Sequence, residues 1–349
     1  PDHLAHFARA VAERYPWLDA YTPVNEPLTT ARFAALYGHW HPHTRDEPSM
    51  IRALLHQVRA VQRSMREVRK INPAARLIQT EDLGRVWSTP AMRYQADYEN
   101  ERRWLSLDML SGRVNRHHPL WQHLWWLGLT HDDLDPLIAD ACPPDVIGGN
   151  YYITSERFLD HRLDRYSKES RGGNGRDQYA DVEAVRVRAD GVAGPAVLLR
   201  EAWQRYQKPV AITEAHLGAS PTAQVRWLTN VWRDATALIQ EGIPVPAVTI
   251  WSLFGSWDWP SLCTRLDHHY EPGTFDARHD PPRPTPLAGL AIALAAGDSS
   301  EDENAPQRGW WERSDRLLYP PVDAEGCDVD EERWRSSTGD HQSRLRMTG

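Results

Sequence analysis

Short apolar segments alternate with longer amphipathic segments along most of the chain. The apolar segments predict strands at about residues 19–24, 76–79, 145–153, 209–213 and 245–251. The amphipathic segments repeat apolar residues at helical spacing and predict helical sequence at about residues 3–15, 49–70, 92–141, 196–206, 221–241 and 284–296. Strands and helices that alternate in this way are typical of a parallel sheet covered by helices.

This order of elements predicts an α/β fold of the (β/α)8 TIM-barrel type. Five strands are expected where a closed barrel has eight, so we interpret the chain as about the last five β/α units of such a barrel. We assign residues 1–297 to this partial barrel and expect a long Gly- and Arg-rich loop inside it at 164–195. Residues 298–321 are interpreted as a linker, and the charged residues 322–349 as a disordered tail.

Composition narrows the class of protein. The net charge of −8 argues against a nucleic-acid or anionic-membrane partner, and no apolar stretch approaches the roughly 18 residues of a membrane-spanning helix. Three widely separated cysteines, Cys142, Cys263 and Cys327, form no CxxC pair, so we expect neither a zinc site nor a disulfide framework. The alternating His39, His41 and His43 are interpreted as rim or packing groups, and no metal is expected. These features predict a cytoplasmic protein.

Two glutamates stand at the ends of predicted strands. Glu26 follows the first strand and Glu214 follows the fourth. The carboxyl ends of barrel strands converge at one mouth, and two facing carboxyl groups are what glycoside hydrolysis requires. Either glutamate alone could equally well cap a turn. Glu81 and Asp82 end another strand and could line the same cleft or have no role. The sequence also holds 16 tryptophans, which pack in cores and stack against sugar rings.

Four sequence blocks then occur in a family-specific order: residues 22–27 (TPVNEP), 145–152 (DVIGGNYY), 212–214 (ITE) and 251–259 (WSLFGSWDW). Through these blocks about residues 1–296 resemble glycoside hydrolase family 1, the β-glucosidase family. The resemblance implies a retaining hydrolase of β-linked O-glycosides, with Glu26 as general acid/base and Glu214 as nucleophile. It implies a small carbohydrate as substrate and no cofactor.

The resemblance also implies roles around the two carboxyls. Asn25 is expected to hydrogen-bond the sugar 2-hydroxyl, Tyr152 to donate to the nucleophile, and Asn150 to support the same cluster. Trp251 is expected to form the platform beneath the sugar ring. The full set of substrate-binding positions implied by the resemblance is Asn25, Asn150, Tyr152, Trp251, Asp258 and Trp259.

The sequence departs from the family pattern at several positions. Glu214 is followed by Ala215 and His216 where the family has Asn-Gly, and Asp258 replaces a glutamate that grips two sugar hydroxyls. Gln and His-Trp positions that the family takes from its first and third strands have no counterpart. These departures leave the sugar and aglycone open and predict impaired activity.

A narrower resemblance adds a second hypothesis. Residues 28–40, 309–311 and 317–321 look like the family-1-like domain fused to dTDP-4-dehydrorhamnose reductase. No strand–GxGxxG–helix unit occurs, and the glycines at 172–175 lie in a polar loop, so no NAD(P) is expected. The alternatives are a non-catalytic sugar or sugar-nucleotide binding domain of such a bifunctional protein, and a chain without a function of its own. The oligomeric state is left open.

Overall fold

The computed structural model describes residues 1–297 and 308–329. The chain divides into two compact units. Unit 1 comprises Pro1–Leu83, Glu101–Tyr151 and the described part of Pro195–Ser299; unit 2 comprises Gly84–Asn100, Tyr152–Gly194 and the described part of Ser300–Gly349. A five-stranded sheet lies in unit 1 and a four-stranded sheet in unit 2.

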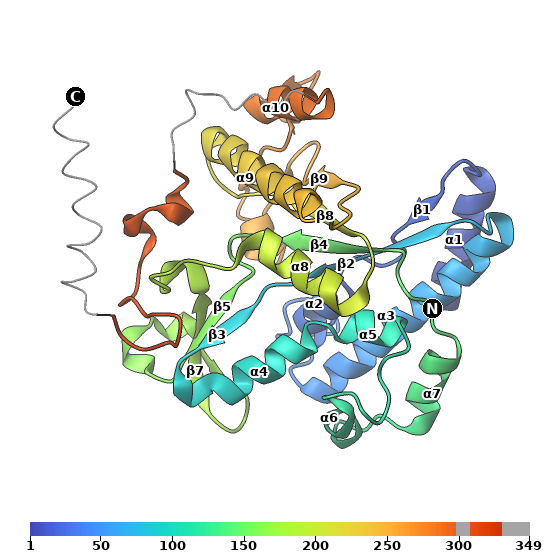
Figure 1. Cartoon of the computed structure of the whole chain (residues 1–349), viewed down its shortest axis with the longest axis horizontal. Helices are drawn as coiled ribbons and strands as arrows, with labels where there is room; N and C mark the ends of the chain where they lie inside the picture. The colour runs from blue at the N-terminus through green and yellow to red at the C-terminus, as the bar shows by residue number, and fades with distance from the viewer. Residues whose placement is uncertain (298–307, 330–349) are drawn as a thin grey trace. The chain divides into compact units, whose positions relative to one another are not determined.

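A five-stranded parallel sheet forms the centre of unit 1 (Figure 1). Its strand order is β1-β2-β4-β8-β9, and every neighbouring pair is parallel. All five predicted strands are therefore confirmed, and their carboxyl ends share one edge of the sheet. The strands are β1 (Ala20–Tyr21), β2 (Arg76–Asp82), β4 (Val146–Tyr151), β8 (Val210–Ala215) and β9 (Val248–Ile250).

Two glycines let the middle strand pack closely. Every residue of β4 is buried. A Cβ atom on Gly148 would lie 2.7 Å from Oγ1 of Thr213, and one on Gly149 would lie 2.8 Å from Cδ2 of Leu199. Side chains at these two positions would push β4 away from its neighbours, so glycine is required where this strand approaches the carboxyl edge of the sheet.

Amphipathic helices cover this sheet, as the spacing of apolar residues predicts. The longest, α3 (Glu47–Ile71), starts at Asp46, whose side chain accepts a 2.7 Å hydrogen bond from the N–H of Ser49. It buries Leu54, Val58 and Met65 completely. Such burial stabilises a fold by about 1.5–3 kcal/mol for each large side chain. Helix α1 packs on α3, and α9 packs on β8 and β9 (Figure 1). The other helices of this set are α1 (Asp2–Arg14), α2 (Pro27–Ala31), the π-helix η1 (Arg32–Leu36), α8 (Gly194–Tyr206), α9 (Pro221–Gln240) and α10 (Pro286–Ala295).

The aromatic-rich stretch 92–141 is not one continuous helix. It forms α4 (Arg93–Arg102), α5 (Leu105–Leu110), α6 (Trp121–Trp126) and α7 (His131–Ala139). A buried ionic cluster joins α5 to α8 within unit 1. The fully buried carboxylate of Asp108 accepts hydrogen bonds from Nη2 of Arg205 at 2.5 Å and the hydroxyl of Tyr206 at 2.9 Å, and lies 3.2 Å from Nε2 of His118.

Unit 2 contains a sheet that the sequence did not predict. The expectation of a long loop at 164–195 is wrong, because this stretch contributes two strands to a sheet of order β3-β5-β7-β6. Phe158, Ala180, Val182, Val187 and Val322 form its apolar core. The inward residues of this stretch are mostly small and lie among glycines and arginines, so the strand pattern was not recognised in the sequence. The strands are β3 (Val86–Ser88), β5 (Arg157–Asp160), β6 (Arg171–Gly173) and β7 (Gln178–Glu183).

Residues 308–329 also pack in unit 2. Val322 is fully buried and forms a backbone β-bridge with Arg188. Oδ1 of Asp328 forms ion pairs with Nη1 of Arg162 and Nη1 of Arg165, each at 2.6 Å. Arg316 donates to the carbonyls of Val185 at 2.6 Å and Ala189 at 2.9 Å. The domain boundaries expected at 297 and 321 stay a prediction, since residues 298–307 and 330–349 lie outside the described residues.

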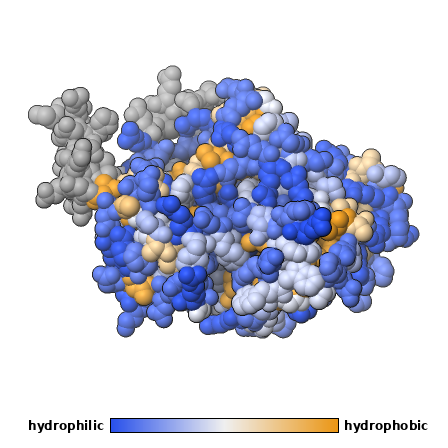
Figure 2. Space-filling view, turned by 60° about the horizontal axis from the view of Figure 1, so that its bottom comes forward, coloured by the Kyte–Doolittle hydropathy of each residue, from blue (hydrophilic) through white to orange (hydrophobic). Residues whose placement is uncertain are grey.

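The surface shown in Figure 2 is largely hydrophilic, with hydrophobic side chains in small separate groups. Among the exposed large apolar residues are Phe7, Trp17, Trp126, Leu266 and Ile292. Across residues 1–297 and 308–329, no helix has both the length and the apolar character needed to cross a membrane.

The Asp108 cluster gives a test of stability. Burial alone would raise the pKa of Asp108, but hydrogen bonds from His118, Arg205 and Tyr206 hold this pKa below its usual value. Asp108→Asn removes the charge these donors face, and we expect it to lower the free energy of unfolding by about 3 kcal/mol at pH 7. Urea unfolding measures this change. The exposed Asp132→Asn in α7 is the control, with an expected loss of about 1 kcal/mol or less. Equal losses in both variants would show that the cluster does not stabilise unit 1.

Candidate active site

The carboxyl edge of the unit 1 sheet collects acidic and amide side chains. In the sheet register Asp82 is opposite Asn150, and Asn150 is opposite Glu214. Residues opposite one another on parallel strands project from the same face, so these three side chains form a row across β2, β4 and β8. Asn25 and Glu26 follow β1 at the same edge, and Trp251 follows β9.

Glu26 has an unusual backbone conformation. Its φ of 44° and ψ of 63° lie in the left-handed region, which side chains other than glycine rarely adopt. Its N–H donates to Oγ1 of Thr80 at 3.3 Å, and its carbonyl accepts from the N–H of Thr30 at 2.8 Å. Two residues after Glu26, the N–H of Leu28 donates a 2.8 Å hydrogen bond to the buried carboxyl of Glu81. This turn stores about 1–3 kcal/mol of strain, and its neighbours hold it in place.

Two amide side chains connect Glu26 to Glu214. Nδ2 of Asn150 donates to Oε1 of Glu26 at 2.8 Å and lies 3.2 Å from Oδ1 of Asn25. Nδ2 of Asn25 in turn donates to Oε1 of Glu214 at 3.3 Å. The structure therefore brings together four of the residues predicted from the sequence, on three different strand ends.

Two threonines that the sequence analysis overlooked orient these amides. Oγ1 of Thr213 donates to Oδ1 of Asn150 at 2.6 Å, and Oγ1 of Thr80 donates to Oδ1 of Asn25 at 2.6 Å. With its oxygen so occupied, each amide directs its N–H groups toward the carboxyls. Each threonine directly precedes a strand-end glutamate, and that position is the signal by which they could have been found.

The environment of Glu26 favours its protonated form. Burial raises its pKa, and the negative charges of Asp82, Glu214 and Glu81 raise it further, whereas the hydrogen bond from Asn150 lowers it. The net result is a pKa well above the ordinary value of 4.5. Burial likewise raises the pKa of Glu81 to about 7. A carboxyl group that keeps its proton near neutral pH can act as a general acid.

Trp251, which the resemblance makes the sugar platform, lies against two other rings. The ring centroids of Trp251 and Trp259 are 5.4 Å apart, and the ring of His216 meets Trp251 edge-on at 4.9 Å. Asp258 has a positive φ of 54°, and its Oδ1 accepts a 2.8 Å hydrogen bond from the N–H of His269. One carboxylate oxygen of Asp258 thus caps a backbone group.

Tyr152 belongs to unit 2, where its N–H donates to Oγ of Ser155 at 3.0 Å. Its expected contact with the nucleophile stays a prediction. The glycines at 172–175 lie in the hairpin of β6 and β7. Across the described part of the chain, no group of three or more His, Cys, Asp and Glu side chains is placed to hold a metal ion.

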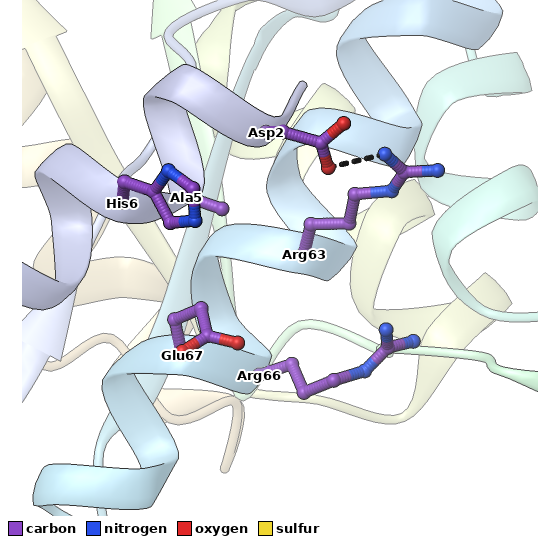
Figure 3. A pocket seen from close by; sticks show the side chains of 6 residues that line it. All are labelled: Asp2, Ala5, His6, Arg63, Arg66 and Glu67. Carbon is purple, nitrogen blue, oxygen red and sulfur yellow. Dashed lines mark hydrogen bonds and ion pairs between the residues drawn. The ribbon is translucent and has the colours of Figure 1, made fainter.

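A separate polar pocket of about 250 Å³ lies on helices α1 and α3 (Figure 3). Asp2 points across it to Arg63, with which it forms an ion pair. Arg66 is paired with Asp140, and Glu67 with Arg9 and Lys70. These charged side chains already form ion pairs within the protein, so they do not indicate a binding site for a charged ligand.

No family model matches the chain. Among solved structures, the family 1 β-glucosidase from Thermotoga maritima is similar, with a TM-score of 0.66 and 17% identity over 86% of this chain and 68% of that chain. The β-glucosidase from Thermotoga maritima in complex with deoxynojirimycin has a TM-score of 0.64 at 18% identity, with the same coverage. At this identity the likeness concerns the fold, and it confirms the predicted α/β fold of the (β/α)-barrel type.

The raised pKa of Glu26 predicts how stability changes with pH. The pKa of the Glu26 carboxyl is higher in the folded than in the unfolded protein. The free energy of unfolding therefore falls as pH rises from about 4.5 toward the pKa of the folded state. Glu26→Gln removes this loss, so we expect its free energy of unfolding to exceed that of the unmodified protein at pH 7. The gain should vanish at pH 4.

Urea unfolding between pH 4 and pH 7 measures this difference. The exposed Glu13→Gln is the control and should show no such trend. Asp82→Asn should shift the pH window of the Glu26 effect downward, because one of the negative charges that raise the Glu26 pKa is removed. A Glu26→Gln variant that is equally destabilised at every pH would contradict this assignment.

Proposed function

We propose that this protein is a retaining glycosidase of β-linked O-glycosides, with Glu26 as general acid/base and Glu214 as nucleophile. The observation that carries the proposal is the pair of strand-end carboxyls joined through Asn25 and Asn150, one of them with a strongly raised pKa. A protonated and an ionised carboxyl at one site are the two groups that this chemistry needs.

In the first step, the Glu214 carboxylate attacks the anomeric carbon while Glu26 donates its proton to the departing glycosidic oxygen. The bond to the aglycone breaks, and a covalent glycosyl–Glu214 ester forms. In the second step, ionised Glu26 takes a proton from a water molecule, whose oxygen attacks the same carbon and releases Glu214. Two inversions return the sugar with its original configuration.

The pKa of Glu26 is suited to both steps. Before the first step, Glu214 is ionised and its charge helps Glu26 keep its proton. Once Glu214 is esterified its charge no longer raises the pKa of Glu26, so the ionised form needed as a base becomes easier to reach. The same residue thereby serves as acid and then as base.

The remaining predicted residues are assigned to binding. We propose that Asn25 turns its amide from Glu214 toward a sugar 2-hydroxyl, and that the face of Trp251 stacks on the apolar C–H groups of a sugar ring. Trp259 and the second oxygen of Asp258 are proposed to contact hydroxyls.

A non-catalytic sugar or sugar-nucleotide binding domain is the second candidate. It is favoured by Asp258, because one of its oxygens is used by the backbone of His269 and so is not free to grip two hydroxyls. A binding domain would retain sugar affinity and lack turnover.

Hydrolysis of a panel of aryl β-glycosides tests the proposal. We expect turnover on at least one sugar, and a loss of about 10³-fold or more in Glu214→Gln, because the covalent step has no other nucleophile. Glu26→Gln should lose most activity on poor leaving groups and less on dinitrophenyl glycosides, whose departure needs little proton transfer. Glu13→Gln is the control. Turnover that survives in Glu214→Gln would refute the assignment, and sugar binding without turnover would favour the second candidate.

A further inference from the structure

A buried histidine–carboxylate pair lies beside the proposed site but includes none of the reacting groups. Nε2 of His216 is 3.0 Å from Oε2 of Glu271, and the two side chains are only 6% and 12% exposed. The other oxygen, Oε1, is 3.8 Å from Nε2 of His269, too far for a hydrogen bond. His216 is therefore the ring that the Glu271 carboxylate holds.

This pair ties together two segments of the site. His216 comes two residues after Glu214, directly beyond β8. Glu271 lies on β11 (Tyr270–Glu271), which pairs with β10 (Ser256–Trp257) in the hairpin that follows Trp251. The carboxylate also lies against the chain at Gly218, where a Cβ atom would be 2.7 Å from Oε1 of Glu271. Glycine at 218 thus leaves the space that the carboxylate occupies.

The pair bears directly on the proposed sugar platform. The ring of His216 meets that of Trp251 at a centroid distance of 4.9 Å and an angle of 75°. Trp259 contacts Trp251 at 5.4 Å. An imidazole that is bonded to a carboxylate at one nitrogen keeps one orientation, and an edge-to-face neighbour then restricts the tilt of the indole.

We propose that His216 and Glu271 form a positioning pair that holds the ring of Trp251 and thereby sets the affinity of the site for the sugar ring. This inference rests on the proposed function, since it takes Trp251 as the platform. It assigns the pair to binding and not to bond breaking. Loss of the pair should therefore raise KM and weaken a sugar-shaped inhibitor, while kcat changes little.

The test uses the whole chain with aryl β-glycosides and with deoxynojirimycin as the binding probe. His216→Ala and Glu271→Ala should each raise KM and the Kd for deoxynojirimycin by roughly tenfold or more, because a displaced platform binds poorly. Glu271→Gln keeps an oxygen that accepts from His216 and should restore values close to those of the unmodified protein. Should an alanine variant fail to fold, His216→Phe keeps the ring and loses the hydrogen bond, and the same rise in KM is expected.

The chain supplies a matched control at a distance in sequence from the site. His131 lies 3.2 Å from Asp135 and meets Trp125 edge-on at 5.0 Å, so it repeats the histidine–carboxylate–tryptophan contacts at an exposed position on α6 and α7. His131→Ala should leave KM and the Kd for deoxynojirimycin unchanged.

The outcomes separate this inference from the proposed function. If KM and the Kd for deoxynojirimycin change less than twofold in His216→Ala and Glu271→Ala but rise in Trp251→Ala, the positioning pair is refuted. The proposed glycosidase function then stands. If kcat falls as far as KM rises, the pair acts in catalysis and the inference is also refuted. If the unmodified protein neither hydrolyses the glycosides nor binds deoxynojirimycin, the proposed function fails and takes the inference with it.

Discussion

The arrangement of the site depends on one buried amide. Asn150 ends the fully buried strand β4, between Asp82 on one side and Glu214 on the other. Because Thr213 donates to its oxygen, its N–H group must face Glu26 and Asn25. Two acidic groups brought together under partial burial repel each other, and the repulsion is smallest when one of them keeps its proton. Asn150 donates to Glu26, and Asn25 connects the network to Glu214. The same strand ends therefore gather the carboxyls, and burial together with the neighbouring negative charges holds the pKa of Glu26 well above its ordinary value.

The sheet provides this amide with a fixed position. Gly148 and Gly149 allow β4 to approach β8 and α8, and Glu81 anchors the turn that holds Glu26 in its strained conformation. Burial leaves Glu81 with a pKa of about 7, so the anchor is itself a costly group to keep in the interior. Packing on α3 and α9 stabilises the sheet against these costs. Stability and the proposed function thus place opposite demands on the same residues.

Much of this could be predicted from the sequence. The five strands and most helices followed from the period of apolar residues. Glu26 and Glu214 were predicted from their positions at strand ends, and Asn25 and Asn150 from the family resemblance. Interactions between distant segments could not be predicted. His216 and Glu271 are far apart in the chain, and no local pattern shows that they meet. The hydrogen bond from the N–H of His269 to the carboxylate of Asp258 could not be predicted for the same reason. The hairpin of β6 and β7 was overlooked because β6 is exposed and glycine-rich, and β7 buries only Tyr179, Ala180 and Val182.

The central claim is that Glu214 becomes covalently attached to the sugar. A 2-deoxy-2-fluoro aryl β-glycoside tests this directly, because the fluorine slows release of the glycosyl-enzyme more than its formation. We expect the intact mass to increase by one fluorosugar, the label to map to the peptide containing Glu214, and Glu214→Gln to prevent labelling. An unlabelled protein that nevertheless hydrolyses the parent glycoside, or a label on another carboxyl, would contradict the account.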